Sequence, residues 1–198
     1  MILCRGTMTH TLLVRITHWI NTVVLLALVI SGAAILLAHP RLYWGETGAF
    51  GSPALIELPL PLDLDQSGWG RSLHFLAAWI LVLNGTVYVL SGLASRHFTI
   101  DMSRYNVLQR VAYLAVIFVL VPLMVTTGLA MSPAVTAALP FIVQMFGGYQ
   151  SSRTIHFFVT NFLLAFLLGH VTMVVLAGFR TQMRGMIAGE RSPAKEQA

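Results

Sequence analysis

Long apolar stretches alternate with short polar segments along this chain, and four of them are long enough to cross a lipid bilayer. The hydrocarbon core of a bilayer is about 30 Å thick, a distance that a helix of about 20 residues spans. The four predicted spans are residues 14–37, 73–93, 111–131 and 155–178. The pattern therefore predicts an all-α membrane protein, a bundle of four transmembrane helices that forms one domain over residues 1–198.

The composition supports a membrane protein and excludes a soluble enzyme. The chain is 57% hydrophobic and 10% charged, with a mean hydropathy of +0.78. A soluble domain carries roughly 25% charged residues. The first span is longer than the apolar region of a secretory signal peptide, and no A-x-A-like cleavage site follows it, so we expect it to be retained.

The positive charges predict the orientation in the membrane. Four crossings place both termini on one side, and Arg41, Arg71 and Arg153 are the only basic residues expected on the other. The terminal side would carry Arg5, Arg15, Arg96, Arg104, Arg110, Arg180, Arg184, Arg191 and Lys195. By the positive-inside rule both termini are predicted to be cytoplasmic. Because topology accounts for most of the net charge of +5, we expect no nucleic-acid partner.

One connection is much longer than the others. Residues 38–71 hold several prolines and aromatic residues among acidic side chains. A loop of this length favours a docking surface for a partner, or else an interfacial loop anchored by its aromatic residues. Residues 141–149 are expected to form a short interfacial turn, and the polar tail at 189–198 is expected to be flexible.

Histidines provide the candidate chemistry. Ionisable residues are rare inside membrane spans and each is a functional hypothesis. His10, His39 and His97 fall outside the spans, whereas His18, His74, His156 and His170 fall within them or at their ends. The alternating direction of the spans pairs His18 with His170 near the inner surface and His74 with His156 near the outer surface.

Two imidazoles at each of two depths favour haem with two axial histidines at each level. Zinc or copper would normally recruit further ligands, and a proton relay would use carboxylates, which the spans lack. A lone membrane histidine is usually an interhelical hydrogen-bonding residue. Four histidines that match in depth argue against that explanation for the whole set. With a single cysteine, Cys4, and no C-x-x-C-H motif, covalently attached haem is excluded.

An arginine precedes three of these histidines by three residues. Arg15, Arg71 and Arg153 give the motifs R-I-T-H, R-S-L-H and R-T-I-H. Residues i and i+3 share a helix face, so each guanidinium would lie one turn nearer water, where the propionates of a haem would emerge. Arginine binds carboxylates in bidentate fashion. The alternative is that these arginines only mark the ends of the spans.

With these motifs in hand, the chain resembles the membrane cytochrome b family that includes prokaryotic cytochrome b561 and the b-type subunits of nickel–iron hydrogenase. The specific stretches are L-L-V-R-I-T-H-W-I-N from Leu12 to Asn21, R-S-L-H-F, R-T-I-H-F and the L-G-H that ends at His170. The resemblance covers roughly residues 9–187. It implies a four-helix core in a bacterial inner membrane, with two haem b groups on the four histidines. The H-P-R-L-Y-W-G segment from His39 to Gly45 is similar to that of cytochrome b partners of periplasmic molybdopterin oxidoreductases.

The leading hypothesis is therefore an electron-transfer subunit that exchanges electrons between quinone and a periplasmic redox partner. Arg104, Asn106 and Gln109 are candidate quinone-binding residues, although an amphipathic helix entry explains them as well. One alternative is an enzyme of the cytochrome b561 type that oxidises superoxide and reduces quinone by itself, with Arg71 and Arg153 attracting the anion. A second alternative is a haem-free anchor or transporter.

Overall fold

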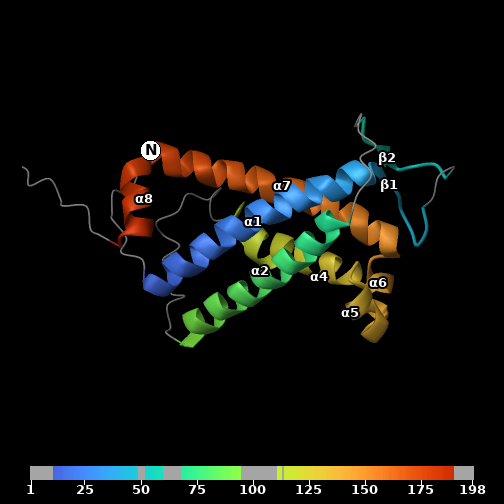
Figure 1. The fold of residues 1–198 in the computed structure, drawn as a ribbon, viewed down its shortest axis with the longest axis horizontal. Coiled ribbons are helices and arrows are strands. Elements are labelled where there is room, and N and C mark those ends of the chain that lie inside the picture. The colour runs from blue at the N-terminus through green and yellow to red at the C-terminus, as the bar shows by residue number, and fades with distance from the viewer. Residues whose placement is uncertain (1–10, 49–51, 60–67, 95–110, 113, 190–198) are drawn as a thin grey trace, which may run out of the picture. The chain divides into compact units, whose positions relative to one another are not determined.

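The computed structural model describes residues 11–48, 52–59, 68–94, 111–112 and 114–189. These residues are mostly helical, as the apolar pattern predicts. Within these described residues, only a two-stranded antiparallel sheet departs from the all-α prediction. In chain order the elements are α1 (Leu12–Ala38), β1 (Arg41–Leu42), β2 (Ile56–Glu57), α2 (Trp69–Ala94), the π-helical segment η2 (Val116–Leu120), α4 (Val121–Ala130), α5 (Pro133–Ala138), α6 (Phe141–Met145), α7 (Tyr149–Leu176) and α8 (Phe179–Ile187) (Figure 1).

Three of the predicted spans correspond to helices that are long and apolar enough to cross a membrane. They lie at Leu12–Ala38, Trp69–Gly92 and Tyr149–Leu176. At the predicted third span the structure has a shorter apolar helix, Val116–Ala130. The three long helices begin before the predicted apolar spans do, α7 at Tyr149 instead of residue 155. The four-span bundle and the side on which the termini lie remain predictions.

The third apolar segment is irregular because of a proline. Pro122 has no N–H with which to continue the α-helical ladder, and it follows η2 directly. Here the N–H of Val121 bonds to the carbonyl of Val116, five residues back. A π-helical turn is one of the ways in which a helix adjusts around such a break. Residue 122 was thus a sequence signal for this irregularity.

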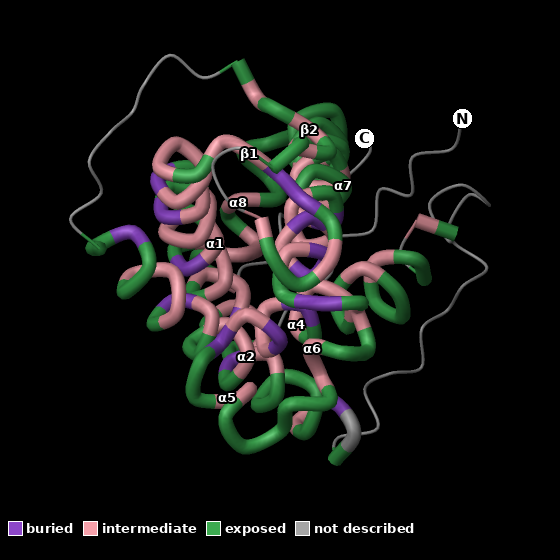
Figure 2. Tube along the Cα trace, turned by 90° about the vertical axis from the view of Figure 1, so that its right-hand side faces the viewer, coloured by how far each residue is buried: buried purple, intermediate pink, exposed green. Residues whose placement is uncertain are grey.

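The described helices expose large apolar side chains and bury small ones. Leu26, Leu83, Phe118, Phe162 and Leu168 are each more than half exposed. The buried helical positions are mostly small or β-branched residues: Val24, Ser31, Ala34, Ala77, Thr127, Ala130 and Val159. Figure 2 shows these buried positions as short segments among exposed and half-buried ones. Such a distribution is typical of helices that face lipid and approach one another through small residues.

The chain divides into two compact units, each of which is described by itself. The first comprises residues 1–30, 72–104 and 168–198, and the second comprises residues 31–71 and 105–167, in each case as far as they are described. The helices α1, α2 and α7 contribute to both units.

In the first unit, α1 and α2 are joined by buried polar groups. The side-chain amide of Asn84 donates hydrogen bonds to the carbonyl of Thr17 at 2.8 Å and to Oδ1 of Asn21 at 2.7 Å. Asn84 is 9% exposed and Thr17 is 5% exposed. In a lipid environment such interhelical bonds contribute about 0.6 kcal/mol on average. These bonds join α1 and α2 within one turn of His18.

In the second unit, the segment 39–45 is held against the first turns of α7. We call this segment, together with β2, the outer clip, after the side of the membrane on which the charge pattern predicts it. Thr154 donates to the carbonyl of Tyr43 at 2.6 Å, and Gly45 donates its N–H to Oγ of Ser151 at 2.7 Å. The carbonyl of Gly45 accepts the N–H groups of Gln150 and Ser151. Because these N–H groups belong to the first turn of α7, which has no intrahelical partners for them, the clip caps the helix.

The other edge of this segment pairs with β2. Arg41 lies opposite Glu57 in the register, and their side chains form an ion pair at 2.8 Å. The hydrogen bond and charge of Glu57 raise the pKa of Arg41 above its usual value. Both side chains are exposed, so the ion pair adds little stability. Burial of Leu42 and Tyr43 against the unit contributes more.

The structure thus describes the predicted long loop over part of its length. Tyr43 is buried, whereas Trp44 and Trp69 are 60% and 47% exposed. The aromatic residues thus divide into one that anchors the clip and two that remain accessible on its surface or beside it.

Candidate functional site

The structure places all four candidate histidines on long helices. His18 lies on α1, His74 on α2, and His156 and His170 both lie on α7. The first three are half-buried and His170 is exposed. His39 is exposed beyond the end of α1, whereas positions 10 and 97 lie outside the described residues.

One predicted histidine pair lies within a single unit, and the other has one histidine in each unit. His18 and His170 belong to the first unit, together with His74, and His156 belongs to the second. The predicted pair His18/His170 therefore lies within one unit. The predicted pair His74/His156 is divided between the two units. Both pairings remain predictions.

His156 has the most fully described environment of the four. Its Nδ1 lies 2.9 Å from the hydroxyl oxygen of Thr127 on α4, a residue with no exposed surface. The same hydroxyl donates to the carbonyl of Leu123 at 2.7 Å. Since a hydroxyl has one proton, a Thr127 hydroxyl that donates to Leu123 is able to accept a hydrogen bond from Nδ1–H of His156. In that arrangement Nε2 of the imidazole carries the lone pair.

A glycine lies beside the same ring. A Cβ atom at Gly128 would meet Cε1 of His156 at 3.6 Å, an ordinary contact distance, so Gly128 lies beside the ring. A ring oriented by a hydrogen bond at one nitrogen is typical of metal-ligating histidines. These residues fit an axial ligand of haem iron, which binds one imidazole nitrogen.

Arg15 contacts the end of another helix in the first unit. Its Nε donates to the carbonyl of Met186 at 3.1 Å, and a terminal guanidinium nitrogen donates to the carbonyl of Ile187. Nε1 of Trp19 donates to the same Met186 carbonyl at 3.3 Å. Arg15 and Trp19 therefore cap the C-terminal end of α8, where the helix dipole favours a positive charge.

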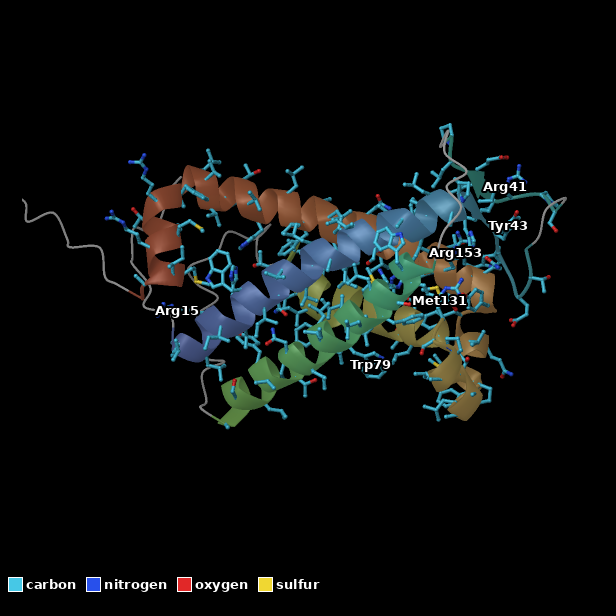
Figure 3. All side chains as sticks on the ribbon, viewed as in Figure 1. Arg15, Arg41, Tyr43, Trp79, Met131 and Arg153 are labelled. Carbon is cyan, nitrogen blue, oxygen red and sulfur yellow. The ribbon has the colours of Figure 1, made fainter. Side chains whose placement is uncertain are left out.

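Arg153 contacts the outer clip in the second unit. Its terminal nitrogens donate to the carbonyl of Arg41 at 3.2 Å and to the carbonyl of His39. Figure 3 shows Arg41, Tyr43 and Arg153 gathered beside the first turns of α7. Arg71, in the first turn of α2, is exposed.

These contacts add a structural role to two of the arginines that were predicted to bind propionates. A guanidinium has five N–H donors, so a carbonyl contact and a carboxylate contact can coexist on one side chain. The propionate role of Arg15, Arg71 and Arg153 remains a prediction. The candidate quinone residues Arg104, Asn106 and Gln109 lie outside the described residues.

Two residues of the site were missed by reading the sequence. Thr127 lies beside His156, next to Gly128, and Thr154 holds the clip. The T-G pair at residues 127–128 in an apolar helix, and the S-S-R-T run at residues 151–154, were the available signals. Small and hydroxyl residues are common in membrane helices, so neither signal identified a partner by itself.

The length and apolarity of α1, α2 and α7 define a multi-pass membrane protein. The family model of prokaryotic cytochrome b561 matches residues 9–189. A putative protein-methionine-sulfoxide reductase subunit, YedZ1 of Azospira oryzae, is 30% identical over an alignment 190 residues long that covers 82% of this chain and 87% of the relative. No solved structure matches the chain. The chain thus belongs to the prokaryotic cytochrome b561 family, and it is a membrane haem b electron-transfer subunit.

Proposed function

We propose that this protein carries two haem b groups and transfers electrons between the quinone pool and a molybdopterin oxidoreductase on the periplasmic side of a bacterial inner membrane. His18 and His170 would ligate one haem, and His74 and His156 would ligate the other. Bound haem b supplies one-electron redox chemistry at its iron. The single observation that carries the proposal is the contact between Thr127 and Nδ1 of His156, which orients the imidazole and suits a ligand that binds iron through Nε2.

The arginines would complete the two sites. Arg15 and Arg153 are held by backbone carbonyls, which limits the rotamers that their side chains adopt. A pre-oriented guanidinium loses less conformational entropy when it binds a carboxylate. We therefore assign the propionate contacts to these two residues and to Arg71, whose exposed side chain lies one turn before His74.

The partner is inferred from the relative. Its name describes a subunit of a protein-methionine-sulfoxide reductase, so we propose protein-bound methionine sulfoxide as the final electron acceptor of the complex that this chain serves. Quinol oxidation releases two electrons and two protons. The reduction of one sulfoxide to a thioether consumes two electrons and two protons and releases one water, so the exchange balances.

The charges support an orientation. We propose that both termini lie in the cytoplasm, because nine of the twelve basic residues are then expected on that side. The outer clip, with its exposed Trp44, then faces the periplasm, where the partner would dock. Quinone would bind near Arg104, Asn106 and Gln109 on the inner side.

The haem content of the purified full-length chain tests the proposal. We expect a b-type absorption spectrum that quinol reduces, two haems per chain by the pyridine haemochromogen assay, and two midpoint potentials in a redox titration. One haem per chain would contradict the two-haem arrangement. A chain without haem would contradict the proposal as a whole. Rapid reduction by superoxide without a partner protein would favour the enzyme alternative instead.

Thr127→Val should shift the potential of one haem and leave the other unchanged. The substitution removes the acceptor of the Nδ1–H bond but keeps the volume of the side chain. His156 then donates less electron density, so the reduced state gains stability relative to the oxidised state and the midpoint potential rises. Each tenfold change in the equilibrium ratio of reduced to oxidised haem corresponds to about 59 mV for a one-electron couple.

The matched variants make this measurement specific. Thr127→Ser keeps the hydroxyl and should keep the potential. Thr126→Val removes a neighbouring hydroxyl that bonds only within its own helix, to the carbonyl of Pro122 at 2.8 Å and that of Leu123, and should have no effect. If Thr126→Val shifts the potential as much as Thr127→Val does, the hydrogen bond to His156 is not the cause.

A further inference from the structure

The helix α8 separates its apolar and basic residues onto adjoining faces. At 100° per residue, Phe179, Met183 and Ile187 lie within an arc of about 80° on the helix surface. Arg180 and Arg184 follow next to this arc, one turn apart. Phe179 and Ile187 are 51% and 59% exposed. The sequence has no acidic residue from position 178 to position 189, so no carboxylate on the helix neutralises these arginines.

The helix is also held where a membrane surface would be. It follows the end of α7, and Gly178 between them has a φ of 104°, a left-handed conformation that glycine adopts without strain. Figure 1 shows the chain turning sharply there, so that α8 runs across the direction of the last turns of α7. Its other end is fixed to the beginning of α1 by Arg15 and Trp19. Both attachments lie at the ends of membrane-spanning helices.

The same side chains line an open depression on the surface of the helix. It has a volume of about 400 Å³ and is lined by Phe179, Arg180, Met183, Arg184, Ile187 and Ala188. A surface that places two guanidinium groups next to apolar side chains is complementary to a molecule with an anionic head and a hydrocarbon body.

We propose that α8 lies in the bilayer interface and binds the phosphate group of anionic phospholipids through Arg180 and Arg184. Phe179, Met183 and Ile187 enter the region of the acyl chains, as in other amphipathic interfacial helices. The guanidinium groups remain at the level of the lipid phosphates, which they bind with charge-assisted hydrogen bonds. The helix thereby anchors the ends of α1 and α7 to the charged surface on their side of the membrane.

The test uses the full-length protein with its bound haem, reconstituted in phosphatidylcholine bilayers. Trace amounts of spin-labelled phosphatidylglycerol or spin-labelled phosphatidylcholine report, by electron paramagnetic resonance, the fraction of each lipid that the protein immobilises. We expect a preference for phosphatidylglycerol at low salt, with each arginine contributing about fivefold. The preference should fall in Arg180→Gln/Arg184→Gln and decrease steeply at high ionic strength.

Two further variants identify the cause of any change. Arg191→Gln/Lys195→Gln removes the same charge from the tail and should keep the preference, as should Arg180→Lys/Arg184→Lys, which retains the charge on α8. Equal immobilisation of the two lipids by the unaltered protein would overturn the proposal. It would also be overturned if the tail variant lost as much preference as the α8 variant, or if inorganic phosphate at matched ionic strength displaced the anionic lipid.

Discussion

Replacing His170 with alanine should leave one haem per chain instead of two. The proposed ligand pairs are independent, so loss of one imidazole should release the haem that it ligates and leave the other in place. His18→Ala should lose the same haem, and His74→Ala and His156→Ala should both lose the other one. The pyridine haemochromogen assay gives the stoichiometry, and a redox titration of each variant identifies which midpoint potential has disappeared.

His39→Ala is the matched control, because His39 is exposed beyond the end of α1 and should keep both haems. The pairing is wrong if His18→Ala and His170→Ala leave different potentials. The two-site arrangement is wrong if any single replacement removes all haem from a chain whose circular dichroism remains helical. Each outcome of the series therefore distinguishes one ligand arrangement from the others.

Gly148→Ala should detach the outer clip from α7. The residue has a φ of +120°, and a Cβ atom there would lie 2.5 Å from the carbonyl carbon of Gly45. The left-handed backbone costs about 1–2 kcal/mol for a residue with a side chain. Displacing Gly45 also breaks its three hydrogen bonds to Gln150 and Ser151, at about 1 kcal/mol each. Amide hydrogen exchange over residues 39–45 should therefore become much faster.

Gly147→Ala distinguishes the steric clash with Gly45 from the cost of a left-handed backbone conformation. Gly147 has a φ of +75°, but a Cβ atom there would meet only Oγ of Ser151, at 3.8 Å. This variant carries the cost of a left-handed alanine without moving Gly45, so exchange in the clip should rise much less. Similar exchange rates in the two variants would show that the contact with Gly45 does not hold the clip in place.

The sequence predicted the long helices well because one requirement, hydrogen bonding of the backbone in lipid, determines their structure. A span of about 20 apolar residues has to form helix in lipid, where each backbone polar group needs a partner within the segment. Hydroxyl residues in these helices obey the same requirement. Thr22 donates to the carbonyl of His18 and Thr160 to that of His156, each four residues back.

The irregular parts were less predictable because they depend on contacts between distant segments. Nothing local to residues 39–45 indicates that they pair with β2 on one side and α7 on the other. The outer clip forms because Ser151, Thr154 and Arg153 present donors or acceptors at the right positions, 106 to 114 residues further along the chain. Likewise, helical periodicity placed His156 on a span but could not place Thr127 against it.

The candidate ligands were found through chemistry, since an ionisable residue in a membrane span is costly to bury. The roles of the arginines were only partly visible. Spacing indicated that Arg15 and Arg153 share a helix face with their histidines, but not that both would donate to backbone carbonyls. Every residue of a chain has a carbonyl acceptor, so the sequence alone cannot show which carbonyl a given arginine binds.

The way in which α7 holds the outer clip leaves the outward side chains of the clip free to vary. The carbonyls of His39, Arg41, Tyr43 and Gly45 all accept hydrogen bonds from α7. Those of Pro40 and Leu42 accept the N–H groups of Leu58 and Leu55 instead. The acceptors in the clip are therefore main-chain carbonyl groups, which every amino acid has. Outward side chains such as Trp44 and Glu46 can therefore be exchanged without loosening it, which would let homologous subunits match different partners on one unchanged scaffold.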